Sequence, residues 1–365
     1  MNTRSGRSIT IVGGGLAGLT LGIGLRRRDV PVAICEAGHY PRHRVCGEFI
    51  SGRGQAVLER LGLGRLLSEA GAIQAHNVRF FSGNRSGPAR TLRAPALSLS
   101  RFVFDSTLAY AFTEAGGELR EGVRWQSDFG EGVVQATGRR VAPNDGEQRW
   151  FGLKVHARNM TLTADLEMHS LGNGYVGLSR LSGDEVNVCG LFRRLGTDSS
   201  ANAAAQPGPS ARISGTAGRT LAWKTRLCGP EGSALHTRLL QAEFDADSFC
   251  SVAGLCLEPH LEAGQTDCRI GDALTMTPPV TGNGMSMAFE TAAIAVEPLT
   301  AYSRGSMSWS QVRTAIALAC EQTFASRLAW ARRLQWLMFA PILRPFAAPL
   351  LNSTLLWRTL LAKTR

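Results

Sequence analysis

Several features that would place a chain in a well-known class are absent from these 365 residues. The eight cysteines include no CxxC pair, so neither a zinc site nor a dithiol redox centre of that type is indicated. No run of about 18 apolar residues occurs, which argues against a membrane-spanning helix. Glycines interrupt the apolar part of the first segment, unlike the core of a secretory leader. We therefore expect a cytoplasmic protein with reduced, mostly buried thiols and no metal.

Lysine is also scarce. Lys154, Lys224 and Lys363 are the only lysines among 40 basic residues, so the net charge of +11 comes almost entirely from arginine. The arginines are scattered and no nucleic-acid-reading motif accompanies them, so we expect no nucleic-acid partner. Solvated surface is the simplest interpretation of this charge, and attraction to acidic ligands or anionic lipid is the alternative.

The first forty residues have the pattern of a βαβ unit. Residues 8–12 read as a short buried strand, residues 16–28 as a helix that ends in three arginines, and residues 31–36 as a second strand. The basic helix end complements the negative end of the helix dipole.

A glycine-rich turn joins the first strand to the helix. In "VGGGLAG", Gly13 permits a tight turn, Gly15 lets a pyrophosphate approach the backbone, and Gly18 lets helix and strand pack closely. The start of the helix offers free N–H groups to phosphates. Glu36 ends the next strand, where a carboxylate can accept hydrogen bonds from the hydroxyl groups of a ribose. This context predicts a bound dinucleotide.

The remaining chain reads as alternating elements followed by a helical tail. We expect helices over 53–70 and 101–115, a buried strand over 132–138, an antiparallel meander over 151–193, a long loop over 195–220 and a strand over 247–258. Residues 266–297 read as a strand, a loop and a helix that Pro298 stops. Residues 306–365 are helical, apolar and basic.

A second motif, "RIGDALTMTPPVTGNG", follows the expected strand at 266. Gly271 and Asp272 end this strand, and an Asp in that position can accept hydrogen bonds from a polyol. Gly282 and Gly284 shape the loop before a helix whose N-terminus can stabilise negative charge on a neighbouring ring.

Together, the motifs resemble the FAD-dependent oxidoreductases that include aromatic hydroxylases, flavin halogenases and geranylgeranyl reductases. In that family the glycine turn and the acid hold the ADP half of FAD, the GD motif holds the ribityl chain, and the second glycine loop meets the flavin. Ser100-Arg101 matches a helix-opening arginine that reaches the FAD phosphates. Residues 44–51 match a bacterial branch with the pattern R-x-C-G-E-x-(I/L)-S, found among geranylgeranyl-reductase-like and polyketide-pathway proteins.

The resemblance implies an α/β fold. It predicts a Rossmann-like FAD-binding domain of the glutathione-reductase and hydroxybenzoate-hydroxylase type, an inserted antiparallel β-sheet substrate domain and a helical C-terminal tail. The FAD-binding segments would be 1–72, 99–150 and 263–300, the substrate-domain segments 73–98 and 151–262, and the tail 301–365. The residues expected at FAD are Gly13, Gly15, Leu16, Ala17, Gly18, Glu36, Arg44, Val45, Cys46, Gly47, Arg101, Val123, Gly271, Asp272, Ala273, Gly282, Asn283, Gly284 and Met285.

The segment "RHRVCGEFIS" at 42–51 leaves two questions open. Cys46 is either a thiol beside the flavin or a small side chain that fills a tight turn. Glu48 is either a proton donor and acceptor or the acceptor of loop-closing hydrogen bonds. We interpret His43 as a surface or phosphate-facing residue, and Arg44 as the better anion contact because its planar fork suits a pyrophosphate.

The family resemblance predicts a monooxygenase that hydroxylates an apolar aromatic or polyketide-like small molecule with reduced flavin and O2. The alternatives are a reductase of prenyl double bonds and an FAD-binding protein without redox turnover. Ala136-Thr137-Gly138 replaces the Asp-Gly motif of hydroxylases, and no second dinucleotide fingerprint occurs, so NAD(P)H would visit only transiently as electron donor. The W-x-W-x-I-P signature of tryptophan halogenases is absent. We assign no catalytic acid or base beyond Cys46 as a flavin-proximal candidate.

The tail allows two interpretations. Trp330, Trp336 and Trp357 stand among leucines and arginines, and prolines divide the segment. Its helices either pack on the domain or make peripheral membrane contact through residues 330–365. His169, Tyr175 and Asn187 in the expected meander are interpreted as structural.

Overall fold

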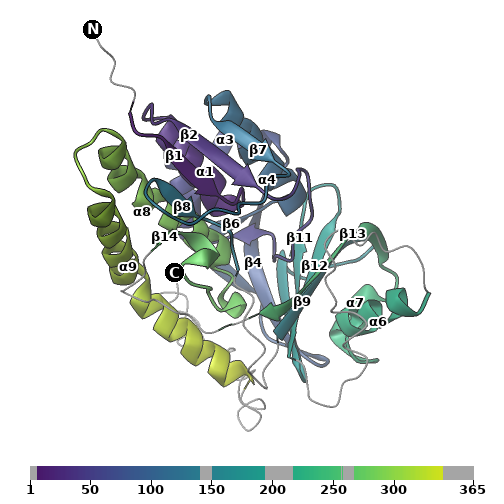
Figure 1. Cartoon of the computed structure of the whole chain (residues 1–365). Helices are drawn as coiled ribbons and strands as arrows, with labels where there is room; N and C mark the ends of the chain where they lie inside the picture. Colours follow the sequence, from purple (N-terminus) through teal and green to yellow (C-terminus); the bar gives the residue numbers. More distant parts are fainter. Residues whose placement is uncertain (1–5, 140–149, 194–216, 256, 258–266, 340–365) are drawn as a thin grey trace.

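The computed structural model describes residues 6–139, 150–193, 217–255, 257 and 267–339 (Figure 1). Two sheets lie at the centre of this part of the chain. Helices α8 and α9 lie on one side of them in Figure 1, and α6 and α7 lie on the opposite side.

Sheet A is parallel throughout and holds the predicted βαβ unit. Its five strands are, in order, β14 (Cys268–Arg269), β8 (Val133–Gln135), β1 (Ile9–Val12), β2 (Val32–Glu36) and β7 (Glu118–Glu121). The strands predicted at 8–12, 31–36 and 132–138 are confirmed. The edge strand β7 carries mostly exposed, charged side chains and therefore gives no apolar signal in the sequence.

Helices α1 (Leu16–Arg26), α4 (Arg101–Glu114) and α8 (Gly284–Ser303) pack together beside sheet A. Every residue of α1 except its last is buried, which explains its apolar, glycine-rich composition. The helix predicted to stop at Pro298 is α8, and this predicted stop is wrong because α8 continues to Ser303. A proline removes one backbone hydrogen bond, but Leu299 and Tyr302 beyond it are buried in the same core, and their burial favours continuation.

The remaining helices of this half differ in part from the sequence prediction. The helix predicted over 53–70 is two helices, α2 (Gly54–Arg60) and α3 (Gly64–Glu69). Gly62 separates them with a φ of +56°, a conformation that ends a helix. The long α9 (Trp309–Phe339) packs against α8, and the Arg327 guanidinium donates two hydrogen bonds, of 3.0 and 2.6 Å, to Glu290.

Sheet B has nine strands. They are β13 (Glu243–Leu255), β9 (Trp150–Arg158), β12 (Val186–Arg193), β11 (Gly174–Arg180), β10 (Leu166–Leu171), β4 (Ile73–Ser82), β6 (Arg90–Ser98) and β3 (Phe49–Ile50) in order, with β5 (Arg85–Ser86) beside β4. All its pairs are antiparallel except β10 with β4.

The meander predicted over 151–193 is correct for β10, β11 and β12 and wrong for β9. Strand β9 pairs with β12 and β13, whereas the free edge of β10 is taken by β4. Eight of the nine residues of β9 are buried, so this strand needs neighbours on both sides.

Two helices cover one face of sheet B. They are α6 (Ala217–Cys228) and α7 (Ala234–Leu239), and Trp223 and Leu227 pack there against Phe151 and Val155. Most of the loop predicted over 195–220 lies outside the described residues. Its last four residues belong to α6, because the apolar side chains that follow at helical spacing require a helix to reach the sheet.

Within the described ranges, no helix combines the length and apolarity needed to cross a bilayer. Residues 340–365 of the tail, including Trp357, lie outside them.

Candidate active site

A cavity of about 960 Å³ lies between the carboxyl ends of the sheet A strands and the second face of sheet B. This volume is at the upper end of the range of roughly 300–1,000 Å³ typical of ligand pockets. Polar backbone and charged side chains line the part next to sheet A. Apolar side chains line the part next to sheet B, and they include Val78, Phe80, Leu92, Met168, Leu191 and Leu255.

The glycine turn after β1 has the geometry of a phosphate cradle. Gly13 has a φ of +109°, and a Cβ there would lie 2.3 Å from the Ala136 carbonyl oxygen. A Cβ on Gly18 would lie 2.0 Å from the Gly13 carbonyl oxygen, so both glycines are required for packing. A Cβ on Gly15 would meet nothing within 4 Å, because this residue borders the cavity. The turn therefore leaves open the space that an approaching phosphate needs.

Glu36 organises the backbone beside this turn. Its carboxylate accepts hydrogen bonds from the N–H groups of Gly14 and Gly38, both at 2.8 Å, and forms an ion pair with Arg42 at 2.8 Å. Burial raises the pKa of Glu36, but the Arg42 guanidinium and the Gly38 amide outweigh burial and lower it overall. Glu36 is thus a charged acceptor at the cavity wall.

Three arginines and one aspartate lie next to Glu36. The Arg101 guanidinium donates two hydrogen bonds, of 2.6 and 2.8 Å, to the fully buried Asp105, and Arg44 lies 3.9 Å from the same carboxylate. Burial and the adjacent guanidinium groups of Arg42 and Arg101 lower the pKa of Arg44. Positive charge therefore exceeds negative charge here, which favours a bound anion.

The second motif reaches the cavity through Asp272. Gly271 opens the 3₁₀ turn η1 (Gly271–Ala273), with a φ of +60° and its N–H bonded to the Thr291 hydroxyl at 3.0 Å. The Asp272 carboxylate lies 3.4 Å from Arg139 Nε, and another nitrogen of Arg139 donates to the Val45 carbonyl at 3.1 Å. Arg139 thus connects the second motif to the loop at 42–48.

The glycine loop before α8 lies at the same cavity. It follows the 3₁₀ turn η2 (Pro279–Thr281), and Gly282 has a φ of +65° with Phe49 packed where a side chain would be. Gly284 and Met285, the first residues of α8, line the cavity, and Asn283 is buried beneath them. The α8 N-terminus has no side-chain cap, so its first amides are available to a ligand.

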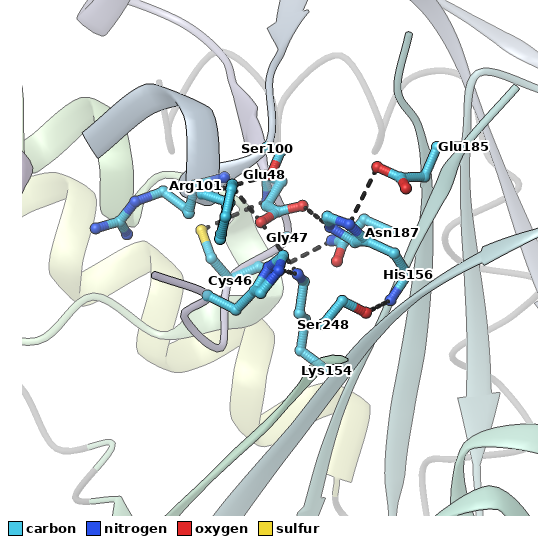
Figure 2. Close-up of polar contacts among 12 residues, drawn as sticks. Cys46, Gly47, Glu48, Ser100, Arg101, Lys154, His156, Glu185, Asn187 and Ser248 are labelled. Carbon is cyan, nitrogen blue, oxygen red and sulfur yellow. Dashed lines mark hydrogen bonds and ion pairs between the residues drawn. The ribbon is translucent and has the colours of Figure 1, made fainter. Parts of the chain in front are cut away.

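The loop at 42–48 forms a wall of the cavity and is held from behind (Figure 2). Asn187 donates to the Cys46 carbonyl at 2.9 Å, and Ser179 donates to the Gly47 carbonyl at 2.6 Å. The Cys46 thiol lines the cavity and also accepts a hydrogen bond from the Glu48 N–H at 3.4 Å. Cys46 therefore completes the turn, and its place beside a flavin stays a prediction.

Most residues expected at FAD border this cavity, and four do not. The lining includes Gly13, Gly15, Leu16, Ala17, Glu36, Arg44, Val45, Cys46, Gly47, Arg101, Val123, Asp272, Gly282, Gly284 and Met285. Gly18, Gly271, Ala273 and Asn283 lie behind it, where they support the turns that carry the others. Their contacts with FAD stay a prediction.

Sequence reasoning missed three groups at this site. Arg42 covers Glu36, Arg139 reaches Asp272, and Lys154 lies buried behind the loop. Arg42 and Arg139 carry no motif and are recognisable only once folded. Lys154 had one signal in the sequence, because a lysine within an apolar strand needs a buried partner.

The structure bears on two single-residue interpretations. His43 is half-buried and lines the cavity, its ring stacks on Phe102 with 4.6 Å between ring centroids, and its Nδ1 lies 2.9 Å from Lys154 Nζ. Its contact with a phosphate stays a prediction. Glu48 accepts loop-closing hydrogen bonds, since its Oε1 accepts the Arg101 N–H at 2.8 Å. No cluster of His, Cys, Asp or Glu within the described ranges is arranged to hold a metal ion.

Comparison with known sequences does not identify a family for this chain. No family model matches the chain. A curated relative, conditioned medium factor receptor 1 of Dictyostelium discoideum, is 26% identical over 125 residues. That alignment covers 31% of this chain and 24% of the relative, so the chain matches about a quarter of its length.

Solved structures are similar over nearly the whole chain. The flavin-dependent brominase Bmp2 superposes with a TM-score of 0.71 at 17% identity, covering 98% of this chain and 93% of that one. PqsL of Pseudomonas aeruginosa, solved with 2-aminobenzoylacetate, gives 0.69 at 14% identity over 95% and 100%. The flavin-dependent halogenase CmlS gives 0.69 at 19% identity over 98% and 68%. The chain therefore has the α/β fold of flavin-dependent halogenases and related flavoenzymes, with a parallel sheet, a second sheet and a helical C-terminal part.

Proposed function

We propose that this chain is an FAD-dependent oxidoreductase, and that it hydroxylates an apolar aromatic or polyketide-like small molecule. The observation that carries the proposal is the continuity of the cavity. One set of lining residues offers a glycine turn, a carboxylate and arginines, and the other set is mostly apolar, with Glu167, Tyr175 and Ser179 among its polar members. A dinucleotide cofactor and an apolar substrate would thus share one cavity.

The residues present suit FAD. Open space beside Gly15 and uncapped N–H groups at the start of α1 suit a diphosphate, and Arg44 and Arg101 add positive charge there. Glu36 suits a ribose, because a carboxylate has about four lone-pair sites and the three donors Gly14, Gly38 and Arg42 do not fill them. Asp272 suits the ribityl hydroxyls. The similar folds named above belong to flavin-dependent proteins, and PqsL is described as a probable FAD-dependent monooxygenase.

The protein's own contribution is binding, orientation and exclusion of water. Reduced FAD, when bound, would supply the electrons that activate O2. The uncapped N-terminus of α8 presents its positive dipole end to the cavity. The wall of Phe80, Met168 and Leu191 presents no charge, so it selects an apolar substrate and keeps the reacting centre dry. No side chain is required as a strong acid or base in this scheme.

Oxygen uptake tests the proposal. The purified protein should carry FAD, identified after release by its absorption spectrum, and should consume NAD(P)H and O2 when a phenolic or other aromatic compound is added. Oxygen uptake that yields a hydroxylated product supports the proposal. Bound FAD without substrate-stimulated oxidation by any donor would support a flavin-binding protein without turnover instead.

A variant pair tests the apolar wall. Met168→Lys places a charge in the cavity and should raise KM for an apolar substrate by roughly tenfold or more, since burying an unpaired charge costs more than about 1.4 kcal/mol. Leu318→Lys is the matched control, because Leu318 is half exposed on α9. Equal KM values for both variants would place the substrate elsewhere.

One observation favours the second candidate, a reductase of prenyl double bonds. Leu334 of α9 lines the cavity, so the C-terminal helix contributes to the apolar wall as it would in a lipid-binding enclosure. Anaerobic turnover of a prenyl substrate with a low-potential electron donor would support this candidate and exclude the hydroxylase.

A further inference from the structure

The Glu48 carboxylate lies in a buried ionic cluster behind the loop at 42–48. Glu48 is fully buried, and it contacts three residues from two elements, α4 and β9. Its Oε1 accepts the Arg101 N–H at 2.8 Å and lies 3.5 Å from Lys154 Nζ, and its Oε2 lies 2.7 Å from His156 Nε2. Figure 2 shows Glu48 between Arg101 and His156.

The cluster continues on the far side of His156. His156 Nδ1 lies 3.1 Å from the Glu185 carboxylate, and the backbone N–H of His156 donates to the Ser248 hydroxyl at 2.7 Å. Burial opposes protonation of His156, but its hydrogen bonds with Glu185 and Glu48 outweigh burial and raise its pKa. Lys154 and His156 therefore balance the two carboxylates, which is the condition for keeping such groups buried.

His43 completes the cluster on the cavity side. Burial and the Lys154 ammonium lower the pKa of His43 to about 4, so the neutral ring accepts a hydrogen bond from Lys154. His43 also lines both the main cavity and a smaller one of about 380 Å³ next to Glu185. The cluster thus lies between the main cavity and a second, smaller one.

The backbone of Glu48 adopts an unfavourable conformation. Its φ of +57° lies in the left-handed region, which costs a residue with a side chain roughly 1–2 kcal/mol. Glycine would adopt this conformation freely. A glutamate held there by three buried donors indicates that the side-chain contacts fix the backbone against its own preference.

We propose that Glu48 is a positioning residue: through Arg101, Lys154 and His156 it fixes the backbone of residues 45–47, and so sets the shape of the cavity wall that Cys46 and Gly47 form. The Cys46 sulfur accepts a hydrogen bond from the backbone N–H of Glu48 and also interacts with the Arg101 side chain, so displacement of Glu48 loosens the thiol. The consequence for a flavin rests on the proposed function, but the positioning does not.

Glu48→Gly separates this proposal from a purely conformational account. Glycine relieves the left-handed backbone and also removes the carboxylate. If the backbone conformation alone mattered, residues 45–47 would become more rigid in this variant. If the carboxylate contacts hold the loop, as we propose, these residues would become more mobile. Asp184→Gly is the matched control, because Asp184 has a φ of +56° but is exposed in a turn. Should Glu48→Gly fail to fold because Lys154 is left unpaired, Glu48→Gly with Lys154→Met restores the charge balance.

The rate of Cys46 alkylation by N-ethylmaleimide in flavin-free protein, followed by mass spectrometry of its peptide, reports the loop directly. We expect this rate to rise roughly tenfold or more in the Glu48 variants, as for loss of charge-assisted hydrogen bonds, and to stay unchanged in Asp184→Gly. Cys268 and Cys320 are buried in the core and report global unfolding, so their rates should not change. Equal Cys46 rates in wild type and both Glu48 variants, or a parallel rise at all three cysteines, would overturn the proposal.

Flavin titration then tests the link to the cavity. The loosened variants should bind FAD more weakly and show a shifted visible absorption band. Faster Cys46 alkylation with unchanged FAD affinity and spectrum would refute the link to the cavity. A wild-type protein that binds no flavin would refute the proposed function while the alkylation rates still decide the positioning role.

Discussion

Gly15 allows the cofactor site to be tested separately from the fold. Its φ of −86° is open to every residue type, and a Cβ there would touch no protein atom within 4 Å. Gly15→Ala should therefore fold normally and even gain about 0.4–1 kcal/mol, because alanine restricts the unfolded chain. The new methyl group nevertheless points into space that we assign to the diphosphate of FAD.

The loss of affinity can be estimated from the contacts at risk. Displacing the diphosphate from the N–H groups of the α1 start removes charge-assisted hydrogen bonds of about 1.5–3 kcal/mol each. Loss of one such bond raises the dissociation constant of FAD by roughly ten- to hundredfold. Gly15→Val, with a larger side chain in the same open space, should raise it further.

The assay combines FAD titration, followed by quenching of flavin fluorescence, with thermal unfolding of the flavin-free protein. Gly18→Ala is the control, because its Cβ would lie 2.0 Å from the Gly13 carbonyl oxygen. It should destabilise the fold by roughly 1–3 kcal/mol, since backbone must shift to admit the methyl group. If Gly15→Val binds FAD as tightly as the wild type, no phosphate approaches this turn and the cofactor assignment is refuted.

Three further predictions concern charged residues. Glu36→Gln should weaken FAD binding by roughly tenfold through loss of a charged acceptor, whereas an unchanged affinity in the same titration would remove Glu36 from the ribose site. Glu167, bonded to His169, Arg238 and Thr163, has a pKa lowered to about 2 because these hydrogen bonds outweigh its burial, so it contributes about 3 kcal/mol that is present above its unfolded pKa of 4.5 and lost as the pH falls towards 2. Urea unfolding of wild type and Glu167→Gln should therefore differ most near pH 7 and converge in acid, and a constant difference would contradict this shift. Arg327→Met should leave Glu290 buried without its partner and destabilise the packing of α9 on α8 by roughly 3–5 kcal/mol, which faster hydrogen exchange confined to α9 and to the part of α8 around Glu290 would reveal.

The sequence predicted the structure well where a feature depends on residues that are close together in the chain. Within the turn, Gly18 must be small because of the Gly13 carbonyl five residues earlier, and Glu36 follows at a fixed spacing through one helix. The course of the chain at Pro298 was not predictable in this way. Whether a helix continues past a proline depends on what Leu299 and Tyr302 can bury against, and that surface comes from other parts of the chain.

Sheet B shows the same limit. The alternation in β10, β11 and β12 identified an antiparallel unit, but the place of β9 beside β12 depends on β4, which precedes it by some seventy residues and occupies the edge of β10. Several strands can pair with the same sheet edge, so the sequence of one strand does not predict which of them does.

By itself, the sequence determined the glycine turn, the acid that follows it and the family that these motifs resemble, because the strand-helix-strand spacing and the contact of Gly18 with Gly13 are local. Only the tertiary structure decided what the segment "RHRVCGEFIS" does. Glu48 meets Lys154 and His156 more than a hundred residues away, and burial in sheet B makes those contacts decisive. A buried carboxylate requires balancing charge, and the fold alone determines which side chains supply it.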